Sequence, residues 1–517
     1  MLMELLPVDV LYIVLDNMLL DTTRNPDPRH EDCTRSCAIA LSSTCRLLRF
    51  KTIPWLFSEL YNWPQRAESL WPQSLWPHIA KLHIRDETVR NKARISISTS
   101  LAGATESMPS LTTVTLRLKT TIPNYLLISL SNCATLFTLS LHQACLDGDE
   151  WPQSLPFAAL ETLTIQYGGI WGVRRRRGSS YDPEREQRNI HQLLKAVSSH
   201  LMNLTLSGDF LSDNFPDIKW VALTSFVVTE HPPRPHIPAD QLVSNMPHLR
   251  NLELLFTPNH VLADFPPFNI GGRTQALPSK LSSLSLSNVN EHDPIFSAIP
   301  DCITTLRLLA VTDLYHPKTR YSNAYSHRLL LDTRPLASPR AESALNHIHN
   351  LALLTSFSVA LYDAPPMGSL IREIANKCPA LRELEVRCLP LNTHMLLSMI
   401  DFKTDSELLL ALGELRALTH LTWFVSTHSC AQNPGPPAHA AYKLFSALPQ
   451  LQTVVYKFGN CYDVSLFSPV VNIWHRELLD GPEPARVVGE LVNIPVSQGE
   501  YMQRLTELWR QNPIIDT

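Results

Sequence analysis

Apolar residues recur in a fixed phrase along most of the chain. The phrase consists of an apolar residue, two variable residues, an apolar residue, one variable residue and a last apolar residue. It first occurs as Ile79/Leu82/Ile84, Leu111/Val114/Leu116 and Leu136/Leu139/Leu141. Further copies begin at Leu160, Leu201, Leu223, Leu249, Leu281, Ile303, Leu354, Leu381, Leu418 and Leu451. The last two apolar residues of a copy are two positions apart, which predicts that they share one face of a short β-strand.

Segments with helical spacing lie between many of these copies. Residues 190–197, 370–375 and 442–445 each carry apolar residues three or four positions apart. The pattern therefore predicts a unit of strand, turn, helix and turn that repeats along the chain. A single unit of this kind cannot bury its apolar face, so the units must stack and stabilise one another.

The phrases resemble the leucine-rich repeat family over about residues 75–460, with most copies about 25–35 residues apart. The family usually places a buried Asn three positions after the second strand leucine. Here the corresponding positions hold Ala144, Gly168, Asp209, Thr257, Val289 and Leu389. We therefore expect an α/β fold of the irregular leucine-rich repeat solenoid (horseshoe) type at residues 64–460. Long excursions are expected at residues 168–187, 231–238, 313–343 and 428–439, which are rich in Pro, Gly and polar residues.

The N-terminal region has a different pattern. Pro7 suits the first position of a helix. Apolar residues recur at helical spacing over residues 10–15 and 38–50, and the region closes with the aromatic and apolar residues that begin at Trp55. Three blocks of this region resemble the F-box motif. They are the opening Leu6-Pro7-x-Asp9-Val10-Leu11-x-x-Val14-Leu15, the centre at residues 43–49 and the end at residues 55–57. Residues 1–63 are thus expected to form a small three-helix F-box-like module ahead of the solenoid.

The F-box resemblance implies a partner, the Skp adaptor of a cullin-RING ubiquitin ligase. Carried over residue by residue, the adaptor-binding face comprises Leu6, Pro7, Val10, Leu11, Val14, Leu41, Cys45 and Leu48. A small helical unit with more apolar residues than its own core can hide also needs a partner surface. The alternative is that these residues only form the core of the module and cap the solenoid.

The repeat strands supply a second candidate surface. The residue between the two strand apolars, and the residue after them, point away from the core because side chains alternate along a strand. These positions hold His83, Arg85, Thr115, Arg117, Ser140, His142, Thr164, Glu253, Arg307 and Glu385. We interpret them as candidate contacts for an unknown protein substrate. The alternative is an ordinary solvated strand face.

Composition and motifs narrow the function. The chain of 517 residues has 44 Lys plus Arg against 48 Asp plus Glu, a net charge of −4, so we expect no nucleic-acid partner. Acidic residues interrupt the apolar N-terminal stretch, so no membrane association is expected. Its 10 cysteines form no CxxC pair, and no nucleotide-loop, zinc-protease or nucleophile-elbow motif is present. We expect no catalytic site, no metal and no cofactor, and a cytoplasmic or nuclear protein.

Two further segments are distinctive. The basic run at residues 174–177 is compatible with a nuclear-import signal, an acidic-partner contact or simply a charged insertion. Residues 461–517 lack a clean phrase and are expected to form a C-terminal capping segment, with an amphipathic helix at residues 500–509. Together the patterns favour the substrate-recognition subunit of a Skp–cullin–F-box type ubiquitin ligase. The alternative is a non-catalytic repeat scaffold whose F-box no longer binds the adaptor.

Overall fold

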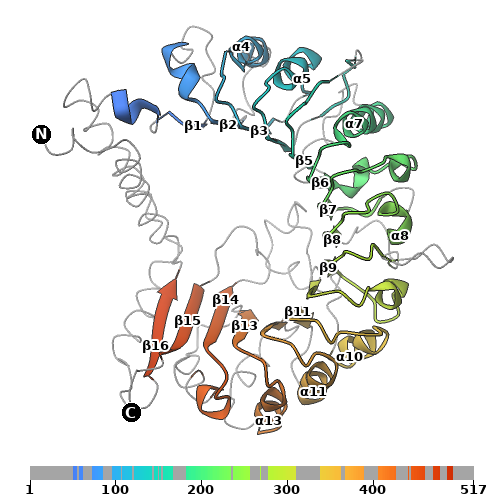
Figure 1. Ribbon diagram of the computed structural model, residues 1–517, viewed down its shortest axis with the longest axis vertical. Helices are drawn as coiled ribbons and strands as arrows, with labels where there is room; N and C mark the ends of the chain where they lie inside the picture. Colours follow the sequence, from blue (N-terminus) through green and yellow to red (C-terminus); the bar gives the residue numbers. More distant parts are fainter. Residues whose placement is uncertain are drawn as a thin grey trace, which may run out of the picture.

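A computed structural model shows one curved sheet with its helices on the outer side (Figure 1). The described residues are 50–61, 73–85, 96–166, 182–256, 268, 277–309, 338–361, 367–388, 406–426, 441–459, 470–477 and 486–492, with short gaps inside several of these ranges. The strands line the inside of an open ring whose gap separates β1 from β16. The predicted α/β solenoid is therefore present. The three-helix module is not shown, because residues 1–49 lie outside the described residues.

The sheet contains sixteen strands in the order of the sequence. Neighbouring strands from β1 to β14 run parallel, and β14, β15 and β16 pair antiparallel. The strands are β1 (Glu59–Tyr61), β2 (Lys81–Arg85), β3 (Thr113–Arg117), β4 (Thr138–His142), β5 (Thr162–Gln166), β6 (Asn203–Ser207), β7 (Ser225–Glu230), β8 (Asn251–Phe256), β9 (Ser283–Ser287), β10 (Thr305–Leu309), β11 (Ser356–Leu361), β12 (Glu383–Cys388), β13 (His420–Ser426), β14 (Thr453–Gly459), β15 (Val470–Glu477) and β16 (Arg486–Val492).

The described helices cover the convex side of the sheet. They are α4 (Ser96–Thr105), α5 (Asn124–Ser131), α7 (Pro183–Val197), α8 (Ala239–Leu242), α10 (Ser338–Asn346), α11 (Gly368–Lys377) and α13 (Ser406–Glu414). Four short 3-10 helices accompany them in the described ranges: η3 (Gln73–His78), η4 (Gly208–Phe210), η5 (Phe215–Asp217) and η6 (Pro294–Ala298). The helices α7 and α10 begin inside two segments that we predicted as loops, 168–187 and 313–343. In α7, Pro183 follows the N-cap Asp182, whose carboxylate accepts the N–H groups of Glu184 and Arg185 at 3.1 and 3.0 Å.

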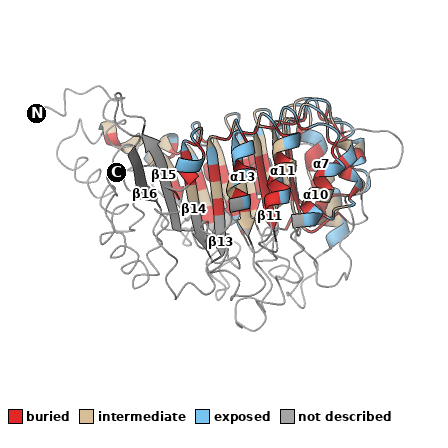
Figure 2. Ribbon diagram, turned by 90° about the horizontal axis from the view of Figure 1, so that it is seen from below, coloured by how far each residue is buried: buried red, intermediate tan, exposed pale blue. Residues whose placement is uncertain are grey.

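The recurring phrase forms the core, as predicted. Every phrase residue whose side chain is described is at most 3% exposed. Figure 2 shows the resulting alternation of buried and less buried residues along the strands. Burial of one such side chain contributes about 1.5–3 kcal/mol, so the free energy of folding is distributed over the whole length of the sheet.

A proline-containing turn leads into many strands. The N–H of the first phrase residue donates to the carbonyl oxygen of an apolar residue three positions earlier, which closes a β-turn. Proline occupies the second position of five such turns in the described residues, where its fixed φ is favourable. These turns are Trp76–Ile79 with Pro77, Met108–Leu111 with Pro109, Met246–Leu249 with Pro247, Cys378–Leu381 with Pro379 and Leu448–Leu451 with Pro449.

A ladder of carbonyl oxygens replaces the missing Asn ladder. The N–H groups of Thr112 and Thr113 both donate to the carbonyl oxygen of Ala80, at 2.8 and 3.1 Å, and the equivalent pair recurs through to Gln452 and Thr453. In six repeats a side-chain hydroxyl adds a third bond to the same carbonyl. We call these six residues the hydroxyl ladder: Thr112, Thr224, Ser282, Thr304, Thr355 and Thr419. These backbone groups at the strand entries are thus paired by backbone and hydroxyl donors.

The ends of the sheet differ from the regular repeats. The strand β1 lies inside the segment that we assigned to the helical module, and it pairs with β2. At the other end, β15 and β16 lie in the predicted capping segment and extend the sheet by antiparallel pairing. The amphipathic helix predicted at residues 500–509 lies outside the described residues.

Candidate functional site

The inner, concave face of the sheet holds all ten predicted substrate-contact positions. Their neighbours in sequence are the buried phrase residues, so alternation places these ten positions on the opposite side from the helices. Arg117 and Arg307 are exposed, whereas His83, Thr115, Ser140, His142, Thr164, Glu253 and Glu385 are half-buried. For Arg85 the structure describes only its strand position, as the register partner of Arg117. The register confirms one face, and the role of these residues in binding stays a prediction.

The part of this face on β2–β5 is polar and open. Parallel register places Thr115, Ser140 and Thr164 side by side in the middle of three adjacent strands. One step toward the C-terminal strand ends, the same register aligns Arg117, His142 and Gln166. We call these six residues, together with Lys81 and His83 on β2, the open concave face.

Two local contacts define the electrostatics of the open concave face. Glu59 on β1 forms ion-pair contacts with Nε2 of His83 at 3.0 Å and with Nζ of Lys81 at 3.9 Å. Burial lowers the pKa of His142, and the positive charge of Arg117 lowers it further, while a hydrogen bond with Gln166 opposes both effects. A depressed histidine pKa is the response expected beside an uncompensated cation.

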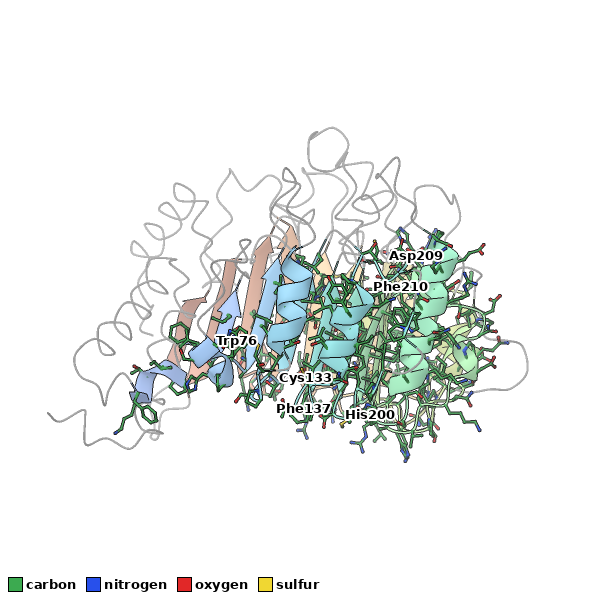
Figure 3. The ribbon with its side chains drawn as sticks, turned by 90° about the horizontal axis from the view of Figure 1, so that it is seen from above. Trp76, Cys133, Phe137, His200, Asp209 and Phe210 are labelled. Carbon is green, nitrogen blue, oxygen red and sulfur yellow. The ribbon has the colours of Figure 1, made fainter. Side chains whose placement is uncertain are left out.

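The C-terminal ends of β6 and β7 form a tightly packed polar edge. Nδ1 of His231 lies 2.9 Å from the carboxylate of Asp209, and His231 is 3% exposed. A Cβ atom on Gly208 would lie 1.8 Å from the carbonyl oxygen of His231, so only glycine fits there. Next to it, Glu230 adopts a φ of 68° and accepts a hydrogen bond from Ser207. Figure 3 shows Asp209 and Phe210 at the edge of the sheet opposite Phe137 and His200.

This edge was missed in the sequence, where we predicted residues 231–238 as a loop because of their prolines. His231, Pro232 and Pro233 are instead buried. The signal that could have found the edge is Gly208, one of only 16 glycines, placed directly after a strand.

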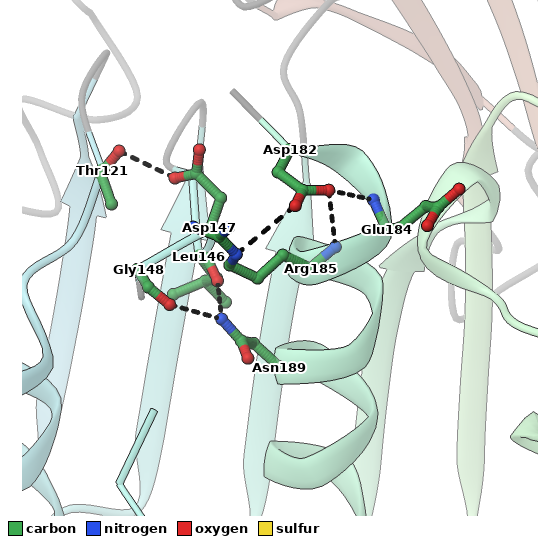
Figure 4. Close-up of polar contacts among 8 residues, drawn as sticks. All are labelled: Thr121, Leu146, Asp147, Gly148, Asp182, Glu184, Arg185 and Asn189. Atoms are coloured by element: carbon green, nitrogen blue, oxygen red, sulfur yellow. Dashed lines mark hydrogen bonds and ion pairs between the residues drawn. The ribbon is translucent and has the colours of Figure 1, made fainter. Parts of the chain in front are cut away.

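The helix α7 anchors the segment that follows β4 (Figure 4). Nδ2 of Asn189 donates to the carbonyl oxygens of Leu146 and Gly148 at 2.7 and 3.1 Å. The buried carboxylate of Glu186 accepts the N–H of Leu146 at 2.7 Å. Nearby, Thr121 donates to Asp147 at 2.8 Å. These bonds hold residues 146–148, which follow β4, in place.

On β9 and β11 the middle position of the concave face is buried, whereas Arg307 on β10 between them is exposed. Register aligns Glu253, Ser285, Arg307, Ser358 and Glu385 across five adjacent strands, from β8 to β12. Ser285 and Ser358 are 1% and 3% exposed, although they point away from the helix-side core. Ser358 donates to Glu385 at 3.0 Å, and Glu385 pairs with Arg387 at 3.2 Å. Of the ten predicted contacts, the three C-terminal ones therefore border a buried patch.

The predicted adaptor-binding residues, from Leu6 to Leu48, lie outside the described residues. Among the residues that are described, no group of three or more His, Cys, Asp or Glu side chains could hold a metal ion. No helix within the described ranges has the length and apolarity needed to cross a membrane.

The chain is similar to solved structures. No family model matches the chain, and no curated protein matches it. The chain is similar to a chain in the crystal structure of the Rad7 and Elc1 complex from yeast, with 15% sequence identity and a TM-score of 0.33. The match covers 69% of this chain and 79% of that one.

Proposed function

We propose that this chain is the substrate-recognition subunit of a Skp–cullin–F-box type ubiquitin ligase. In this proposal the N-terminal segment binds the Skp adaptor, the concave face binds a target protein, and other subunits transfer ubiquitin. The chain itself is then not an enzyme. It accelerates the reaction by raising the effective concentration of the target beside the conjugating enzyme.

The observation that supports target binding is the open polar part of the concave face on β2–β5. Adjacent strands lie about 4.8 Å apart, so the four strands β2–β5 alone span about 15 Å, enough to contact an extended segment of a partner protein. The adaptor half of the proposal rests on the F-box resemblance of residues 6–57, and each half needs its own test.

The adaptor half is tested by co-purification of the tagged full-length chain with the Skp adaptor. Leu6→Glu and Val10→Glu each place a charge on the apolar docking face, and either is expected to reduce the recovered adaptor by about ten-fold or more. Leu410→Glu is the matched control, because Leu410 is 68% exposed on α13 and lies in the repeats. The control variant should recover as much adaptor as the unmodified chain.

The outcome separates the proposal from the scaffold alternative. If the unmodified chain recovers no adaptor while its repeats remain folded, the chain is a repeat scaffold and the ligase role is wrong. If Leu410→Glu loses the adaptor as completely as Leu6→Glu, adaptor recovery reflects general stability and the assigned docking face is wrong.

A further inference from the structure

The open concave face has two exposed cations, Lys81 and Arg117. Lys81 contacts the carboxylate of Glu59 on β1, whereas no carboxylate among the described residues pairs with Arg117. The outward-facing strand positions from β2 to β6 hold no Asp or Glu. The next acid on a strand is Glu230 at the end of β7, and its carboxylate accepts a hydrogen bond from Ser207.

Arg117 is the strongest cation on this face. Among the described residues no carboxylate pairs with it, and the register places Arg85 on one side and His142 on the other. Positively charged groups at directly opposite positions of neighbouring strands raise the energy of a sheet. An anion placed between them removes this cost, and the guanidinium fork suits a carboxylate.

Hydrogen-bond donors lie beside the cations. Thr115, Ser140 and Thr164 form a row of half-exposed hydroxyls on β3, β4 and β5. No hydrogen bond within the described part of the chain involves these three hydroxyls, so all of them are available to a ligand. A carboxylate accepts up to four hydrogen bonds, which fits a row of donors next to arginine.

We propose that the open concave face binds an extended acidic segment of the target protein. Arg117 pairs with one carboxylate of the segment, and Thr115, Ser140 and Thr164 donate hydrogen bonds to carboxylate or carbonyl oxygens along it. This inference rests on the proposed function only in that the ligase target supplies the segment. A protein segment is favoured over a nucleic acid because the chain has a net charge of −4 and this face offers hydroxyls rather than aromatic rings for stacking.

The test measures binding of the full chain to a fluorescent peptide of about eight alternating Glu and Ser residues. A matched peptide carries Gln in place of Glu. Binding of the Glu peptide, but not of the Gln peptide, is expected, and it should weaken as salt rises, since exposed charges are screened. Arg117→Glu is expected to weaken binding by about ten-fold or more, which is the effect of turning one charge-assisted pair into a repulsive one.

Arg416→Glu is the matched control. Arg416 is also an exposed arginine, but it lies in the turn between α13 and β13, away from the candidate contact positions. This control should change the affinity for the Glu peptide by no more than about two-fold, because a distant exposed charge is mostly screened. Thermal unfolding of both variants checks that neither result comes from loss of the fold.

Several results would overturn the inference. They are equal affinity for the Glu and Gln peptides, equal loss in Arg117→Glu and Arg416→Glu, and tighter binding of a single-stranded oligonucleotide of the same charge. Recovery of the Skp adaptor is measured on the same preparations. Loss of peptide binding with the adaptor retained contradicts only the acidic-segment inference, whereas peptide binding without adaptor contradicts only the ligase role.

Discussion

The repeats around β3–β5 and those around β9–β11 share one core but have different concave faces. Leu139 on β4 and Leu284 on β9 occupy the same phrase position, and both are fully buried. On the concave side, Ser140 is half-buried whereas Ser285 is only 1% exposed. The recurring phrase thus specifies one face of every strand in the same way, while the other face is open in one region and closed in another.

Side-chain size accompanies part of this difference. On β9 and β11 the buried concave positions hold small residues, namely Ser285, Ser287, Ser358 and Ala360, all at most 3% exposed. Arg307 on β10, between these two strands, is exposed. Ser287 donates to the carbonyl oxygen of Phe256 at 2.7 Å, so part of the buried polarity is paired with the backbone. Half-buried hydroxyls at the middle strand position therefore occur on β3–β5 but not on β9 or β11.

The largest expected effect concerns an acid buried after β9. Burial raises the pKa of Asp293 to about 6 from 3.8, and this is opposed by backbone N–H groups of Asn290 and Phe268 and by His292. Between these two pH values the folded chain holds more protons than the unfolded chain, so the free energy of unfolding falls as pH rises. Above about pH 6 the buried carboxylate is ionised, and the free energy of unfolding is lower by the full amount. The pKa change corresponds to about 3 kcal/mol.

Asp293→Asn removes this cost. The variant should be more stable than the unmodified chain at pH 7.5, by up to about 3 kcal/mol, with the gain reduced by about half at pH 5. Urea unfolding at the two pH values measures the gain. Asp301→Asn, at an exposed position, is the control and should leave the pH dependence unchanged. A gain that is larger at pH 5 than at pH 7.5 would contradict the assignment.

The second prediction compares the two concave faces directly. Ser285→Phe places a large ring in a closed patch and should cost about 1–3 kcal/mol, whereas Ser140→Phe on the open face should change stability by no more than about 0.5 kcal/mol. Ser285→Ala separates volume from polarity. The Ser285 hydroxyl is buried and makes no hydrogen bond, so its removal should be neutral or slightly stabilising. Thermal unfolding of the three variants measures the difference, and equal costs at both positions would disprove it.

The sequence predicted the core well because that prediction depends only on a local period. Leu281, Leu284 and Leu286 could be placed on one face from their spacing alone, and all are buried. The closed state of Ser285 could not be predicted, because it depends on which distant atoms cover the concave face. The polar edge at Gly208 and His231 was missed for a similar reason, since a contact over 23 residues leaves no periodic signal. The candidate binding face was predicted as a set of strand positions, but not as an open and a closed part.

The smallest expected effect tests whether the hydroxyl ladder is common to both regions. Thr112 precedes β3 and Thr304 precedes β10, and each donates to a carbonyl of the preceding repeat at 3.0 Å. Each carbonyl also accepts two backbone N–H groups, so Thr→Val leaves no acceptor unpaired. Thr112→Val and Thr304→Val should therefore each cost about 0.5–1 kcal/mol, the contribution of one hydrogen bond. Thr164→Val is the control, because the Thr164 hydroxyl has no partner in the described structure, and it should be neutral. Thermal unfolding measures all three, and a cost confined to one region would mean that the ladder stabilises only that part of the sheet.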